Sequence, residues 1–74
     1  MIIELGAIYR HYKGGDYEVI GIARDSESLG ELVVYRALYG DNELWARPLG
    51  MFSEEVDIDG NSVPRFSRQH VPAQ

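Results

Sequence analysis

The sequence predicts a small all-β domain, either an SH3-like barrel or a strongly curled antiparallel sheet of about five to six strands. Short runs rich in β-branched and aromatic residues recur along the chain, and turn-forming residues separate them at intervals of about 8 to 12 residues. No segment has the 3.6-residue apolar period of a helix. The chain has 74 residues, which suffice for one thin hydrophobic core. We therefore assign residues 1–67 to a single domain and residues 68–74 to a frayed C-terminal tail.

Residues 6–13 and 17–24 form the first predicted hairpin. Between them lies Gly14-Gly15-Asp16, where two glycines can adopt the positive φ of a tight turn. The second strand contains Gly21 in its interior, a position that is typical of a bend or a close approach of the backbone. We expect Gly21 to mark the corner of a curled sheet. The polar residues 25–31 then form a loop.

Residues 32–52 form a central hairpin, with its turn at residues 40–42. If that turn is centred on Asp41, Tyr35 lies opposite Arg47 and Ala37 lies opposite Trp45, all on one face. Both faces of the third strand are largely apolar, so we expect it to be central. We expect the opposite face to be the core, with the residues Leu32, Val34, Leu38, Leu44 and Ala46.

The segment after the central hairpin predicts a plug and a last hairpin. Pro48 cannot donate to a ladder, so strand pairing ends there, and the following turn would plug the core with Met51 and Phe52. Val56 and Ile58 alternate with acidic residues before an Asp-Gly turn at residues 59–60. The returning strand carries Val63 and Phe66, and Pro64 marks it as an edge strand.

Several motifs, taken in this order and spacing, carry a family resemblance. They are Tyr9-Arg-His-Tyr-Lys-Gly14, Tyr17-Glu-Val-Ile-Gly-Ile-Ala-Arg24, Leu32-Val-Val-Tyr-Arg-Ala-Leu-Tyr-Gly40, Leu44-Trp-Ala-Arg-Pro48, Met51-Phe52 and Pro64-Arg-Phe66. Together they resemble a bacterial family of small stand-alone proteins catalogued as domain of unknown function 1653. The resemblance spans residues 5–66 and implies a compact cytoplasmic bacterial domain, with no assigned reaction, cofactor or catalytic residue. Where a histidine often follows the Ala-Arg pair in that family, this chain has Asp25.

The composition argues against several classes of function. Twelve acidic residues against seven basic ones give a net charge of -5, which disfavours nucleic acid and anionic membranes as partners. No cysteine is present, so neither a disulfide framework nor a thiolate zinc site is possible. Two histidines and a solvated acidic run at residues 54–59 do not make a metal site, and no phosphate-binding glycine motif occurs. We predict no metal and no cofactor. Without a signal peptide or an apolar run of about 20 residues, we expect a soluble cytoplasmic protein.

Aromatic and arginine side chains are the best candidates for function. We predict a non-catalytic binding or adaptor module that recognises a protein or peptide partner through Tyr35, Trp45 and Arg47 on one sheet face. Further candidate contacts are Tyr9, Tyr12 and Arg36. The competing interpretation is that most of this set is core packing, because a domain of this size needs the large area that tyrosine and tryptophan bury.

Three other functions stay open at this point. A small enzyme could use His11 with a nearby Asp or Ser, although no catalytic residue can be assigned from sequence. Single-stranded nucleic acid could stack on the aromatic face, against the unfavourable net charge. The protein could also be a structural or self-associating domain, as a monomer or weak homodimer that pairs through an edge strand near residues 63–66.

Overall fold

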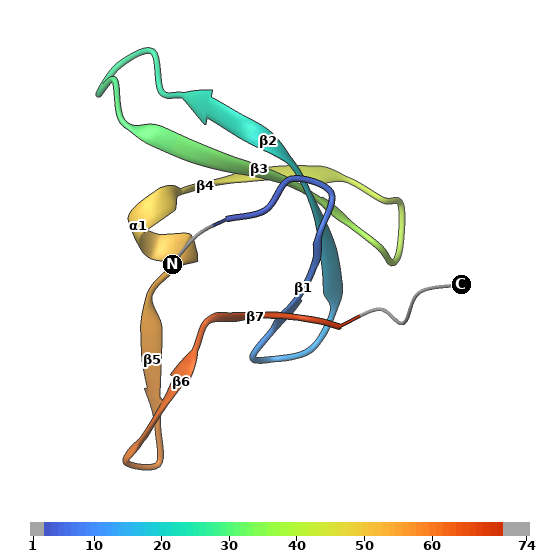
Figure 1. Ribbon diagram of the computed structural model, residues 1–74, viewed down its shortest axis with the longest axis vertical. Helices are drawn as coiled ribbons and strands as arrows, with labels where there is room; N and C mark the ends of the chain where they lie inside the picture. Colours follow the sequence, from blue (N-terminus) through green and yellow to red (C-terminus); the bar gives the residue numbers. More distant parts are fainter. Residues whose placement is uncertain (1–2, 71–74) are drawn as a thin grey trace.

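The computed structural model describes residues 3–70, which form two antiparallel sheets (Figure 1). The five-stranded sheet has the order β4-β3-β2-β1-β7, and β5 and β6 form a separate hairpin. The elements are β1 (Ile8–His11), β2 (Asp16–Arg24), β3 (Glu31–Ala37), β4 (Leu44–Pro48), α1 (Leu49–Phe52), β5 (Glu55–Ile58), β6 (Asn61–Pro64) and β7 (Phe66–Arg68). The predicted antiparallel β architecture is confirmed. Within residues 3–70, no helix is long and apolar enough to cross a membrane.

The five-stranded sheet curls without closing. Its edge strands are β4 and β7, and neither of them pairs with a further strand in the described part of the chain. The prediction of an SH3-like barrel is therefore not confirmed. A β-bulge contributes to the curl. Val19 lies opposite Tyr35 and Gly21 lies opposite Val34, so Ile20 is the extra residue of β2 and has no partner on β3. The predicted bend at Gly21 is confirmed.

The central hairpin has a different register from the predicted one. Tyr35 pairs with Trp45 and Val33 pairs with Arg47, so the turn is centred on Gly40 rather than on Asp41. The backbone φ is 59° at Gly40 and 54° at Asn42. Both lie in the left-handed region that glycine and asparagine tolerate best. Because the change of register is an even number of residues, Trp45 and Arg47 stay on the same face as Tyr35.

The core lies on the face of β3 opposite to the predicted one. Val33, Tyr35 and Ala37 are 0%, 4% and 3% exposed, whereas Leu38 and Leu44 are 44% and 54% exposed. Alternation could not distinguish two faces that are both apolar. The rings of Phe52 and Phe66 decide the matter, because both pack against Tyr35. We call this side of the five-stranded sheet the inner face. Its fully or nearly fully buried residues are Tyr9, Val19, Val33, Tyr35, Phe52 and Phe66.

A single helical turn fills the end of the core with one side chain. Phe52 is 0% exposed, while Met51 is 45% exposed, so the prediction that both residues plug the core is wrong for Met51. Helix α1 has only four residues, and the Ser53 amide donates to the Leu49 carbonyl to close it. One turn cannot point two adjacent side chains inward. The Phe52 ring stacks on Phe66 with a centroid distance of 4.1 Å.

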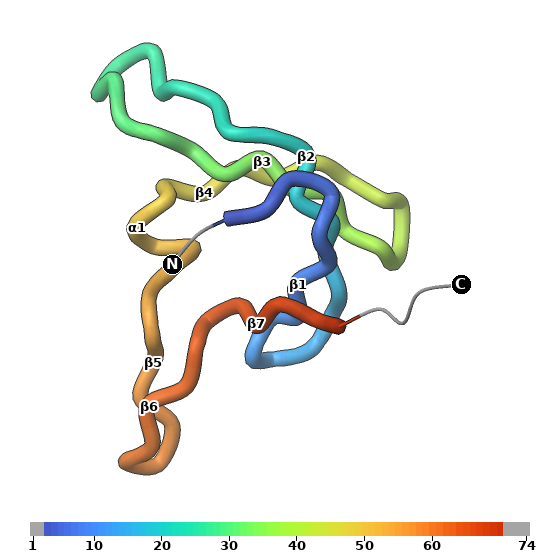
Figure 2. The backbone as a smooth tube through the Cα atoms, in the orientation of Figure 1, coloured from blue at the N-terminus to red at the C-terminus, as the bar shows by residue number. Residues whose placement is uncertain are grey.

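The two ends of the described chain meet at the edge of the sheet. Strand β7 lies beside β1, and the β5–β6 hairpin projects away from the sheet (Figure 2). Arg68, the first residue of the predicted tail, ends β7, and the amide of the next residue, Gln69, donates to the Ile8 carbonyl. Arg68 also pairs with Glu4 across the chain at 2.9 Å. Residues 71–74 of that predicted tail lie outside the described residues.

Phe52 and Met51 offer a matched test of the core. Phe52→Ala removes a buried ring and should lower the free energy of unfolding by about 3–5 kcal/mol. Met51→Ala, one residue away and half exposed, should change it by no more than about 0.5 kcal/mol. Phe52→Leu keeps much of the apolar volume and should fall between the two. Urea denaturation followed by circular dichroism measures all three, and equal losses for Phe52→Ala and Met51→Ala would contradict this core.

Candidate functional site

A groove of about 300 Å³ opens on the inner face, and all five strands of the larger sheet contribute to it. We call it the Trp45 groove. Its lining residues are His11, Tyr17, Tyr35, Tyr39, Trp45, Arg47 and Phe66. The three side chains that the sequence singled out as main contacts, Tyr35, Trp45 and Arg47, are thus brought together.

Trp45 and Tyr35 play different parts in the groove. They are cross-strand partners on β4 and β3, yet Trp45 is 51% exposed and Tyr35 only 4%. Trp45 therefore offers a wide aromatic surface to solvent, whereas Tyr35 forms part of the floor. The floor is rigid, because the Tyr35 ring packs edge-on against Phe52, Phe66 and Tyr17.

Arg47 spans the space between the two edge strands of the sheet. It starts on β4, and its guanidinium carbon lies 5.7 Å from the centre of the Phe66 ring on β7, a distance that allows a cation–π interaction. Its Nε donates to the Tyr35 hydroxyl at 3.4 Å, which is long for a hydrogen bond. Aromatic groups thus hold the cation in place and leave its charge uncompensated.

Arg47 differs in this respect from the other arginines of the described chain. Three of them pair with carboxylates, at 2.7 Å for Arg10 with Asp16, 2.7 Å for Arg65 with Glu54 and 2.9 Å for Arg68 with Glu4. Two donate to backbone carbonyls, Arg24 to Leu29 and Arg36 to Asn42. Within residues 3–70, only Arg47 has neither kind of acceptor, although the chain carries a net charge of -5.

His11 stands at the β1 side of the groove as a neutral imidazole. Its Nδ1 accepts a hydrogen bond from the Lys13 amide at 3.1 Å, so in the neutral ring the proton lies on Nε2. Burial lowers the pKa of His11 from its ordinary value, and the positive charges of Arg47, Arg65 and Lys13 lower that pKa further. His11 therefore stays uncharged at neutral pH and offers a donor.

Neither of the loop aspartates Asp16 and Asp25 is hydrogen-bonded to the His11 ring, as the enzyme alternative requires. Asp16 is engaged with Arg10, whose hydrogen bond and charge lower the pKa of that carboxyl group. Asp25 accepts the Glu27 amide within its own loop at 2.8 Å. In the described chain, the only hydrogen bond of the His11 ring is the one from the Lys13 amide.

Two tyrosines that the sequence did not single out close one end of the groove. The hydroxyls of Tyr17 and Tyr39 are hydrogen-bonded to each other. Burial, together with this contact, raises the pKa of Tyr17 to about 12. The pattern offered a signal for Tyr17, because antiparallel pairing puts it opposite Ala37 on the Tyr35 face. Tyr39 lies beyond the end of β3, where alternation no longer applies.

Three further sequence candidates do not line the Trp45 groove. Tyr9 is 1% exposed and packs edge-on against Phe52, so it is a core residue and cannot contact a ligand in solvent. Arg36 pairs with Leu44 on the outer face of the sheet. Tyr12 lies beyond the end of β1 and borders a different cavity. Alternation does put Arg36 on the face opposite to Tyr35, whereas the positions of Tyr9 and Tyr12 depend on how the sheet curls.

Comparison with known proteins identifies the family. Residues 7–68 match the family described as Protein of unknown function (DUF1653). The chain belongs to this family. It is similar to a solved crystal structure of a protein of the DUF1653 family from Bordetella bronchiseptica, with 35% sequence identity, a TM-score of 0.79, and coverage of 96% of this chain and 95% of that chain. No curated protein matches the sequence.

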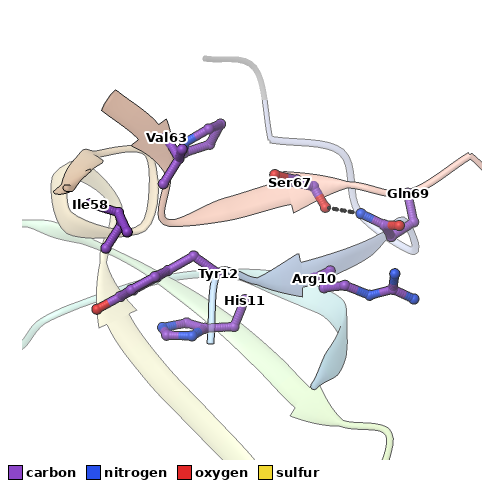
Figure 3. A pocket seen from close by; sticks show the side chains of 8 residues that line it. Arg10, His11, Tyr12, Ile58, Val63, Ser67 and Gln69 are labelled. Atoms are coloured by element: carbon purple, nitrogen blue, oxygen red, sulfur yellow. Dashed lines mark hydrogen bonds between the residues drawn. The ribbon is translucent and has the colours of Figure 1, made fainter. Parts of the chain in front are cut away.

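This DUF1653 protein has a second, larger cavity of about 600 Å³ between the β5–β6 hairpin and the β1–β7 edge. Its lining residues are Arg10, His11, Tyr12, Ile58, Val63, Pro64, Ser67 and Gln69. Tyr12 extends toward Ile58 while Arg10 points away from both, toward the other side of the cavity (Figure 3). Because Arg10 is already paired with Asp16, this cavity is mainly apolar and holds no uncompensated charge.

The Trp45 groove is therefore the better candidate site in this DUF1653 protein. It combines an exposed indole, an unpaired guanidinium and a neutral imidazole donor within one rigid aromatic frame. Among the described residues, no cluster of three or more His, Asp or Glu side chains could hold a metal ion. The chemistry that this arrangement offers is the binding of a flat or anionic group.

The pKa of His11 tests the electrostatics of the groove. Titration followed by NMR of the imidazole should give a pKa below the ordinary 6.5. Arg47→Gln should raise this pKa, because it removes a positive charge that disfavours protonation of His11. Arg24→Gln, a control of equal charge change, should leave it unaltered. Since the unfolded chain takes up the His11 proton first as pH falls below about 6.5, folding stability should decrease in that range. A pKa of 6.5 or higher in the unmodified protein would contradict these electrostatics.

Proposed function

We propose that this protein is a non-catalytic binding module that holds an extended segment of a protein or peptide partner in the Trp45 groove. One observation carries the proposal: a half-exposed tryptophan and an arginine without a carboxylate or carbonyl acceptor line the same groove. Tryptophan and arginine are among the residues that contribute most to binding at protein interfaces. A ligand that covers both would bury the indole and compensate the charge.

The shape of the groove supports a segment rather than a folded surface as ligand. A volume of about 300 Å³ holds about one or two side chains. The floor is preorganised, because Tyr35 and Phe66 are buried in the core beneath it. A rigid floor reduces the conformational entropy that binding must overcome. We therefore expect an extended segment to lie along β4 with a side chain in the groove.

The alternatives have less support. The enzyme alternative needs a group that orients or activates His11, and within residues 3–70 the only hydrogen bond of the ring is the one from the Lys13 amide. Binding of single-stranded nucleic acid would use several cations along a backbone path. The groove contains one arginine, and the whole chain has a net charge of -5. An SH3-like mode of ligand binding and a cytoplasmic location are part of the proposal.

A displayed library of short random peptides tests this function. Peptides selected on the unmodified protein should bind Trp45→Ala about tenfold more weakly or worse, because that variant removes the exposed indole. Leu44→Ala is the matched control, since Leu44 is the preceding residue of β4, is equally exposed and faces the other side of the sheet. Circular dichroism should show both variants folded. Selected peptides that bind Trp45→Ala as tightly as Leu44→Ala would refute the proposal.

A further inference from the structure

We infer that the Trp45 groove is selective for a carboxylate, the acidic side chain of the bound segment, and that Arg47 is the residue that binds it. This inference rests on the proposed function of the same groove and specifies its ligand. It follows from three features of the groove: the free donors of Arg47, the lack of acidic lining residues, and the acidic residues on the far side of Trp45.

Within residues 3–70, most hydrogen-bond donors of the Arg47 guanidinium are unused. Its Nε makes one long contact with the Tyr35 hydroxyl, and its terminal nitrogens have no hydrogen-bond acceptor among residues 3–70. The Phe66 ring beside it fixes the position of the group. A planar guanidinium in a fixed position can donate two parallel hydrogen bonds to a carboxylate, which is the strongest pairing this side chain makes.

No acidic side chain lines the groove around Arg47. None of its seven lining residues is acidic, in a chain with twelve Asp and Glu residues. His11 adds a neutral ring whose Nε2 proton is free, because the Lys13 amide uses Nδ1. Burial is the main cause that lowers the pKa of His11, and the positive charges of Arg47, Arg65 and Lys13 act on the ring in the same direction. A bound carboxylate would therefore meet a positive charge and a second donor.

Acidic residues stand beside Trp45 on the side that Arg47 does not line. A smaller hollow of about 80 Å³ there is bordered by Asp41 and Glu43 as well as by Trp45 itself. An acidic group would be repelled at that end and attracted at the Arg47 end. A segment that lies along β4 is thus oriented, with its acidic side chain at Arg47 and neutral or basic residues near Glu43. The net charge of -5 also favours a segment with few further acidic residues.

A carboxylate fits this site better than a phosphate group. Phosphorylated ligands are bound by clusters of arginines, whereas this groove has a single guanidinium beside an uncharged histidine. A phosphate group carries nearly two negative charges at neutral pH, so its attraction to one cation is opposed more strongly by the acidic chain. We therefore expect an Asp or Glu side chain rather than a phosphorylated residue.

The test uses a library of peptides with acetylated N-termini and amidated C-termini, so that Asp and Glu side chains are the only carboxylates. Selected peptides that require Trp45 should carry Asp or Glu at one fixed position. Replacing that residue by Asn or Gln should weaken binding about tenfold or more, as expected for a hydrogen bond between charged groups. Fluorescence of Trp45, the only tryptophan, reports the binding.

Variants of the protein assign the carboxylate to Arg47. Arg47→Gln should bind the acidic peptide and its amide analogue equally, while Arg24→Gln, which loses the same charge elsewhere on the sheet, should keep the full preference. Arg47→Lys retains the positive charge without the planar guanidinium, so it should keep part of the preference for the acidic peptide. If Trp45-dependent peptides show no acidic preference, or keep one in Arg47→Gln, the inference is wrong while the binding function stands.

A second arm does not depend on peptide binding. Acetylglutamate with an amidated α-carboxyl, acetylglutamine amide and inorganic phosphate are each titrated into the protein, and NMR follows the Trp45 indole and His11 ring signals. The glutamate compound should shift both signals, the glutamine compound should not, and Arg47→Gln should abolish the shift. If these shifts are observed but the library yields no peptide that requires Trp45, the peptide-binding function is refuted and the carboxylate site stands. A larger shift with phosphate, or none with either anion, would overturn the carboxylate assignment.

Discussion

The fold and the groove both depend on the packing of the Phe66 ring. Phe66 stacks on Phe52 at 4.1 Å and contacts Tyr35, Tyr17 and His11 edge-on, so it joins β7 and α1 to the three central strands. The same ring lies beneath the Arg47 guanidinium. One buried side chain therefore completes the core and forms the floor of the candidate site. This coupling explains how so small a chain can present a rigid site.

The open edges of the sheet create the groove. Backbone hydrogen bonds do not join β4 to β7 in the described chain, and side chains from the two edges meet instead. A closed barrel would fill this space with ladder hydrogen bonds. Here the curl that begins at the Gly21 bulge brings the edges together closely enough for Arg47 to reach Phe66. The incomplete closure gives the inner face its access to solvent.

Sequence reasoning found the local features and missed the non-local ones. The turns, the bend at Gly21 and the common face of Tyr35 and Trp45 follow from alternation and turn chemistry over short distances. The choice of the core face did not, because both faces of β3 are apolar and only the packing of Phe52 and Phe66 against Tyr35 buries one of them. The grouping of Tyr35, Trp45 and Arg47 was therefore predictable, but the packing of Phe66 against Tyr35 and Arg47 was not.

The central claim is that ligands bind over Trp45, and acrylamide quenching of its fluorescence tests this most directly. Trp45 is the only tryptophan and is 51% exposed, so the free protein should be strongly quenched. Saturation with a library-selected peptide should protect the indole and lower the quenching constant. If the peptide is bound and acrylamide quenches Trp45 as efficiently as before, the ligand lies elsewhere and the account of the groove is wrong.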